Sequence, residues 1–121
     1  MTREAFESLV ESALKSLPRR FKRMLKNVAV VVEDWPDAAT LEEMRIEPPD
    51  TLYGLYRGVD LPRRGSSYAN TLPDTITIYQ QPIEHDCADE SEMAELVREV
   101  VVHEIGHYFG LDDERMEELE S

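Results

Sequence analysis

The fold of this chain is decided by residues 89–113, which read DESEMAELVREVVVHEIGHYFGLDD. Their pattern predicts a helix that begins at Asp89 or Ser91 and ends near Phe109. Gly110 follows at the position where a left-handed residue commonly ends a helix. One face of the first half is polar, whereas apolar residues surround the second half. We therefore expect the second half to be buried.

Three ionisable residues, His103, Glu104 and His107, lie in the apolar second half of this predicted helix. Burying two imidazoles and a carboxylate costs free energy unless a partner compensates. A bound metal ion is the obvious partner. The alternative is a hydrogen-bonded pair of core histidines with a paired glutamate.

The three residues form the pattern H-E-x-x-H. A spacing of four places the imidazoles one helical turn apart, with roughly 6 Å between their Cβ atoms. Both can then bind one Zn²⁺ through ring nitrogens at about 2.0–2.1 Å. Glu104 lies on the same side of the helix and can contact a zinc-bound water without binding the metal, which is the position of a general base. A random shuffle of this composition contains the pattern with a probability of about 0.01.

A third ligand is expected after the helix. Gly110 allows the chain to turn back sharply, which can bring the residue three positions later, Asp113, to a third ligand position. Asp112 or Asp113 could instead cap a short helix over residues 114–120, and one carboxylate cannot fill both roles. Glu117 and Glu118 are marginal substitutes, because a solvated terminal helix explains their charged run more simply.

Other residues allow two interpretations each. His85 and Cys87 could supply a further ligand, although a free, partly buried thiol also explains Cys87. Trp35, beside Pro36, is interpreted as a packing anchor. Several tyrosines could donate a hydrogen bond to an oxyanion, although each is more often a core or rim aromatic; these are Tyr53, Tyr56, Tyr68 and Tyr79.

The rest of the chain predicts three more helices. Apolar residues at helical spacing indicate helices over 3–17 and 19–26, with Thr2 as the first cap and Pro18 between them. Thr40 begins a capping-box pattern for a short helix that ends before Pro48. These helices flank the predicted strands, so the fold class is α+β.

Three segments have the composition of strands. The β-branched run Val28–Glu33 predicts a central strand covered on both faces. Leu52–Arg57 and Thr75–Gln80 predict two further strands. The polar residues of Thr75–Gln80 are typical of an edge strand, so we expect it to form the rim of a cleft. If this strand is instead paired on both sides, the cleft is expected along Leu52–Arg57. The loop Gly58–Asp74 would lie nearby as a gate.

The composition describes one modest acidic domain, which we expect to span residues 1–121. A single Cys excludes an internal disulfide. The formal charge is −13: residues 1–26 carry seven Lys/Arg and three Asp/Glu, and residues 27–121 carry six and 23. This acidic majority makes nucleic acid an unfavourable partner. No apolar run is long enough to span a membrane, and the acidic start does not resemble a signal peptide, so we expect a cytoplasmic protein.

The segment His103–Asp113 resembles the metzincin consensus, with Asp in place of the third His. Much of the chain resembles a small bacterial zincin-like metallopeptidase family, through the runs VAVVVE, LYGLYRG, LPDTITIY and VVHEIGHYFGLDDERMEEL. The resemblance implies a minimal zincin-like domain, with a short mixed β-sheet beside an active-site helix and N-terminal helices. It also implies Zn²⁺ held by His103, His107 and Asp113, with Glu104 as the catalytic residue.

Two functions fit this pattern. The first is a zinc-dependent peptidase whose peptide or protein substrate lies extended along an edge strand. The acidic charge would then favour peptides that contain Lys or Arg. The second is a zincin-fold protein without turnover that binds metal or peptide in a regulatory role, because fold alone does not establish activity.

Overall fold

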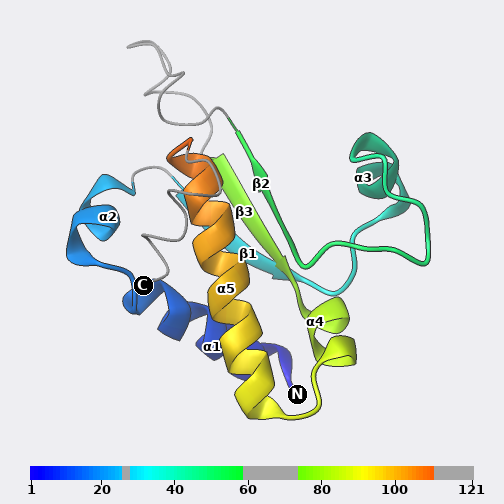
Figure 1. Ribbon diagram of the computed structural model, residues 1–121, viewed down its shortest axis with the longest axis horizontal. Coiled ribbons are helices and arrows are strands. Elements are labelled where there is room, and N and C mark those ends of the chain that lie inside the picture. The colour runs from blue at the N-terminus through cyan, green and yellow to red at the C-terminus, as the bar shows by residue number, and fades with distance from the viewer. Residues whose placement is uncertain (26–27, 59–73, 111–121) are drawn as a thin grey trace.

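The computed structural model describes residues 1–25, 28–58 and 74–110 (Figure 1). The elements in these ranges are a small three-stranded sheet and five helices, which is the predicted α+β class. In chain order they are α1 (Arg3–Lys15), α2 (Arg19–Met24), β1 (Val28–Glu33), α3 (Ala38–Glu43), β2 (Gly54–Arg57), β3 (Asp74–Tyr79), α4 (Gln80–Asp86) and α5 (Glu90–Tyr108).

The described strands form a mixed sheet in the order β1-β3-β2. β1 runs parallel to β3, with Val30 opposite Ile76, and β2 runs antiparallel to β3, with Gly54 opposite Ile78. The mixed sheet is therefore confirmed, but two strand positions are wrong. β1 is not central, and β3 is paired on both sides instead of forming an edge.

The reason for this error is that residue type does not report position in a sheet. Val31 on β1 is 39% exposed although it is β-branched, because such residues favour extended backbone even at an edge. On β3, Thr77 and Tyr79 are only 8% and 3% exposed. Both faces of β3 are thus largely buried, and its threonines do not mark a solvent-facing side.

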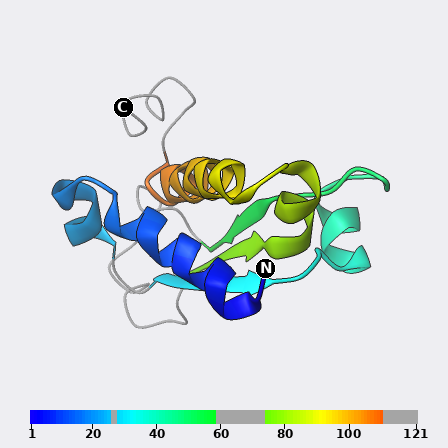
Figure 2. The ribbon, with the colours of Figure 1, turned by 90° about the horizontal axis from the view of Figure 1, so that it is seen from below.

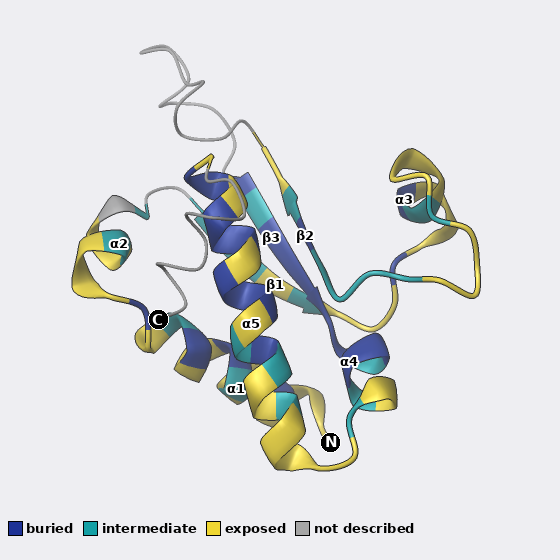
Figure 3. Cartoon of the chain, in the orientation of Figure 1, coloured by how far each residue is buried: buried dark blue, intermediate teal, exposed yellow. Residues whose placement is uncertain are grey.

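One core joins the helices to the sheet. Figure 2 shows α5 lying over the sheet near β2, and α1 packs against α5. Burial along α5 increases toward its C-terminal half (Figure 3). The core residues are Phe6, Val10, Ala13, Leu17, Ile76, Ile78, Ile83, Val97, Val100, Val101, Val102, Ile105, Tyr108 and Phe109.

The start of α1 and the end of α5 follow the predicted signals, whereas α1 ends at Lys15, two residues before the predicted end. Thr2 caps α1 by accepting a hydrogen bond from the Ala5 amide at 3.1 Å. Asp89, and not Ser91, caps α5 by accepting from the Glu92 amide at 2.9 Å. Gly110 follows α5 with φ +70°, the left-handed conformation that ends the helix.

Two local predictions need correction. Asp37, not Thr40, caps α3, because its carboxylate accepts from the Thr40 amide at 2.7 Å. Hydrogen bonds with the Thr40 side chain and with its amide lower the pKa of Asp37. The chain also forms α4 directly after β3, where a strand was predicted to continue to Gln80. Pro82 signals this helix, since proline is tolerated in a first turn, where its missing N–H is not needed.

Several expectations fall on residues outside the described ranges. They concern most of the proposed gate over Gly58–Asp74, the Tyr68 side chain, and the segment after Gly110 with its candidate third ligand Asp113. Within the described residues, no helix combines the length and the hydropathy needed to cross a membrane.

Candidate metal centre and adjoining groove

Helix α5 brings the three motif residues together. The rings of His103 and His107 have centroids 4.6 Å apart and planes inclined at 71°. One potential ligand atom from each of His103, Glu104 and His107 lies within 4.8 Å of the others. This is the one such group of three or more among the described residues. Imidazole nitrogens are ordinary ligands of zinc, so the donor set fits this metal.

The burial of these residues differs from the prediction. Glu104 is only 6% exposed, but His103 and His107 remain accessible to solvent. The helix therefore keeps one open stripe, on which residues four apart lie above one another. The two imidazoles are not buried, so the cost of burying them is no evidence for a metal. Their spacing and accessibility argue for one instead, since an ion must be able to reach them.

Glu104 is the buried member of the group and is held by its neighbours. Its Oε1 lies 3.0 Å from His107 Nδ1. A Cβ added to Gly54 would lie 3.3 Å from Glu104 Cγ and 2.7 Å from Val100 Cγ1. Only a glycine lets β2 approach α5 this closely. Gly54 therefore sets the position of the strand beside the Glu104 side chain.

A groove of about 710 Å³ opens beside this carboxylate. One wall comes from α5 and the other from the start of β2 and the residues before it. Among the described strands, β2 has a partner on one side only, so none of them covers its outer backbone edge. The lining residues are Thr51, Leu52, Tyr53, Gly54, Leu96, Glu99, Val100, His103 and Glu104.

Three of the candidate oxyanion donors lie among the described residues, and each is hydrogen-bonded to an aspartate or buried. The Tyr53 hydroxyl donates a hydrogen bond to Asp86 Oδ2. This bond raises the pKa of Tyr53 to about 12. The Tyr56 hydroxyl donates to the buried Asp74 at 2.6 Å. Tyr79 is buried, and its burial raises the pKa of its phenol. Of these three tyrosines, Tyr53 alone lines the groove.

The other proposed ligands do not join the group. His85 and Cys87 lie at the end of α4 and are not among the three clustered residues. Burial raises the pKa of the Cys87 thiol, which disfavours the thiolate that a metal would bind. Asp113, Glu117 and Glu118 lie outside the described residues, so the third ligand stays a prediction.

The sequence offered Leu52–Arg57 only as the alternative position of the cleft, and it did not identify the wall of the groove that faces α5. This wall is formed by Thr51–Gly54, at the entrance to β2. The signal was Gly54 itself, because a glycine in a strand often marks a close approach of another backbone or element. The sequence does not give the strand order, so it could not identify α5 as the element that approaches Gly54.

The fold and the clustered residues define a zincin-like protein. The zincin-like metallopeptidase family matches residues 25–121, and the chain belongs to this family. The family implies a divalent metal, typically zinc. A solved structure of a conserved hypothetical protein from Thermus thermophilus is similar in fold, with a TM-score of 0.59 and 24% identity over 90% of this chain and 94% of that one. No match was found among curated proteins.

Proposed function

We propose that this protein is a zinc-dependent peptidase. The observation that carries the proposal is the position of the motif: His103, Glu104 and His107 lie together on α5, beside a groove whose other wall leads into an edge strand. A peptidase needs both parts, because the reacting groups must meet a substrate held in an extended conformation.

His103 and His107 would hold the metal, and Asp113 would provide the third ligand. When bound, zinc supplies a Lewis acid that polarises the peptide carbonyl and lowers the pKa of water. Neutral imidazole is the form that binds a metal, so binding requires both histidines to be deprotonated. Their accessibility lets the ion enter without unfolding α5.

Glu104 would act as the general base. Its carboxylate takes a proton from the attacking water and later gives one to the leaving amine. Burial and the contact with His107 restrict its rotamers, which favours a fixed position for this transfer. The Glu104–His107 contact also orients the imidazole, as a hydrogen-bond partner on a ligating histidine commonly does.

The substrate would lie along β2, which replaces Thr75–Gln80 as the proposed rim of the cleft. The edge of β2 that no described strand covers can pair with the backbone of an extended peptide, and the groove would take its side chains. The groove runs from Leu96 to Glu104 on α5. At 1.5 Å per residue this is about 12 Å, the length of three to four extended residues.

The test is turnover of a mixed peptide library with added Zn²⁺, followed by mass spectrometry. Glu104→Gln should lower the rate by roughly 10²-fold or more and keep the zinc. His103→Ala should lose both metal and activity. Glu95→Gln, an exposed acid on the same helix, is the matched control and should change neither. Stoichiometric zinc without cleavage by the wild type would favour the binding protein without turnover.

A further inference from the structure

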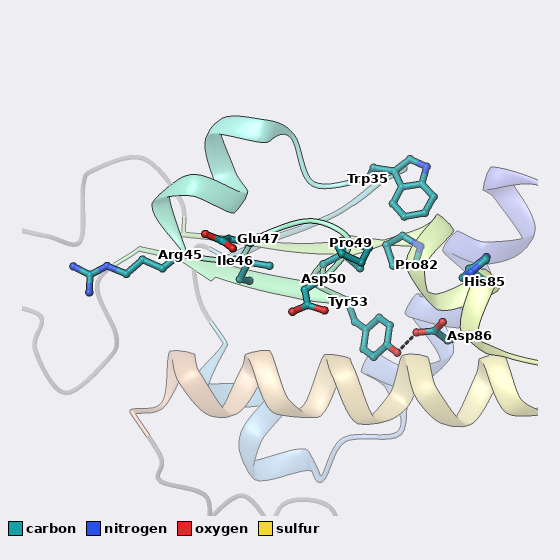
Figure 4. A pocket seen from close by; sticks show the side chains of 11 residues that line it. Trp35, Arg45, Ile46, Glu47, Pro49, Asp50, Tyr53, Pro82, His85 and Asp86 are labelled. Atoms are coloured by element: carbon teal, nitrogen blue, oxygen red, sulfur yellow. Dashed lines mark hydrogen bonds between the residues drawn. The ribbon is translucent and has the colours of Figure 1, made fainter.

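A second cavity, of about 680 Å³, lies next to the groove (Figure 4). Tyr53 and Thr51 line both spaces, so the two are neighbours across a shared wall. The hydrogen bond from Tyr53 to Asp86 holds the phenol in this wall. A side chain of a peptide bound in the groove could therefore enter the cavity beside Tyr53.

Trp35 gives the cavity an aromatic surface. The sequence predicted a packing anchor, but the side chain is 54% exposed and lines the cavity. In Figure 4 its indole lies beside Pro82. An exposed indole face next to a cavity attracts cations, and a guanidinium can stack on it.

The same cavity is acidic. Glu47, Asp50 and Asp86 line it, and Arg45 is the one Lys or Arg among its lining residues. Figure 4 shows Asp50 and Asp86 near Tyr53, whereas Arg45 extends away from them. In the part of the chain that the structure describes, the Glu47 and Asp50 carboxylates form no ion pair. Their charge is therefore not neutralised by a neighbouring side chain.

The wall shared by the groove and the cavity also contains an unpartnered polar atom. Thr51 lines both spaces, and its Oγ1 is buried without a hydrogen-bond partner among the described residues. A buried hydroxyl without a partner costs free energy, so this wall is not optimised for stability alone.

We propose that this cavity binds the side chain of an arginine in the peptide that occupies the groove. The inference rests on the proposed function, because it needs a peptide along β2. The guanidinium would stack on Trp35 beside Pro82, and the carboxylates that line the cavity would attract its positive charge. Arginine suits the cavity better than lysine, since its planar guanidinium can stack on an indole face.

Trp35 provides a direct readout, because it is the only tryptophan of the chain. Glu104→Gln protein with zinc would be titrated with blocked alanine peptides that carry one arginine, one lysine or one citrulline at successive positions. Tryptophan fluorescence reports binding without cleavage. The arginine peptide should give a saturable change at one favoured position. Citrulline, which is neutral but of similar shape, should bind roughly five- to tenfold more weakly.

Single-residue variants distinguish binding in the cavity from general attraction to an acidic protein. Asp50→Asn should weaken arginine binding roughly three- to fivefold, and a second change, Glu47→Gln, should weaken it further. Glu7→Gln removes one exposed charge on α1, away from the cavity, and should leave the affinity unchanged. Equal effects of Asp50→Asn and Glu7→Gln, or equal binding of arginine and citrulline, would overturn the proposal.

Cleavage is scored separately on the wild type with the same peptides. Fluorescence selectivity for arginine without cleavage would support the cavity and contradict the peptidase. Cleavage with no preference for arginine, and with no fluorescence change, would support the peptidase and contradict the cavity. The two proposals can therefore fail independently.

Discussion

At the residue scale, the candidate site combines two exposed imidazoles with one buried carboxylate on the same helix. A buried carboxylate needs a polar partner, and Glu104 has one in His107. The accessible histidines can exchange solvent for a metal, whereas the carboxylate is buried. One turn of α5 thus carries both the groups suited to binding a metal and a group suited to moving a proton.

The first prediction concerns the third ligand. Asp113→Ala should weaken zinc binding by at least tenfold, because two imidazoles alone leave the tetrahedral set incomplete. Asp112→Ala should have little effect. Zinc affinity measured by competition with a chelator of known affinity compares the two variants. Equal effects, or a larger effect of Asp112→Ala, would reassign the ligand.

The second prediction concerns Tyr53. Its hydrogen bond to Asp86 raises its pKa from 10.0 to about 12, because the folded protein favours the neutral phenol. The stabilisation of the folded state by this hydrogen bond is present below pH 10 and is lost as the pH rises from 10 toward 12. Ultraviolet difference spectra against Tyr53→Phe should show this late titration. Asp86→Asn should move it back toward pH 10, and an unchanged titration in that variant would reject the assigned cause.

At the element scale, the sequence predicted those features that depend on residues close together in the chain. Thr2, Gly110 and the H-E-x-x-H spacing act within one or two helical turns, so sequence alone places the start of α1 and the end of α5 and brings His103 near His107. Strand order and the exposure of Trp35 depend on contacts between distant segments. β3 shows the difference, because its Thr77 is buried against partners that the sequence of the strand does not identify.

The third prediction concerns the contact between β2 and α5. Gly54→Ala should destabilise the fold by about 1–3 kcal/mol, because the new methyl group overlaps Val100 Cγ1. Val100→Ala removes that atom, so the double variant should be more stable than the two single costs combined predict. Urea unfolding of the four proteins gives the coupling energy. Strictly additive costs would show that the strand does not rest on this side chain.

At the scale of the whole molecule, α5 serves both the core and the site. Its Val101 and Ile105 are fully buried in the core that also contains Phe6 of α1, while its open stripe carries the two histidines. Any ligand that holds these histidines in helical register therefore also stabilises the fold. The unfolded chain lacks this arrangement, so metal binding and folding must be thermodynamically linked.

The last prediction follows from this linkage. Free zinc at about 100 times its Kd should add about 2.7 kcal/mol to the free energy of unfolding. For a domain of this size, that corresponds to a rise in Tm of roughly 10 °C. Because the chain carries a net charge of −13, any divalent cation could also stabilise it by reducing repulsion between carboxylates. Mg²⁺ at the same concentration measures this general effect, since Mg²⁺ prefers oxygen ligands. His103→Ala should respond to zinc no more than to magnesium, and an undiminished zinc response in that variant would place the stabilising metal elsewhere on the molecule.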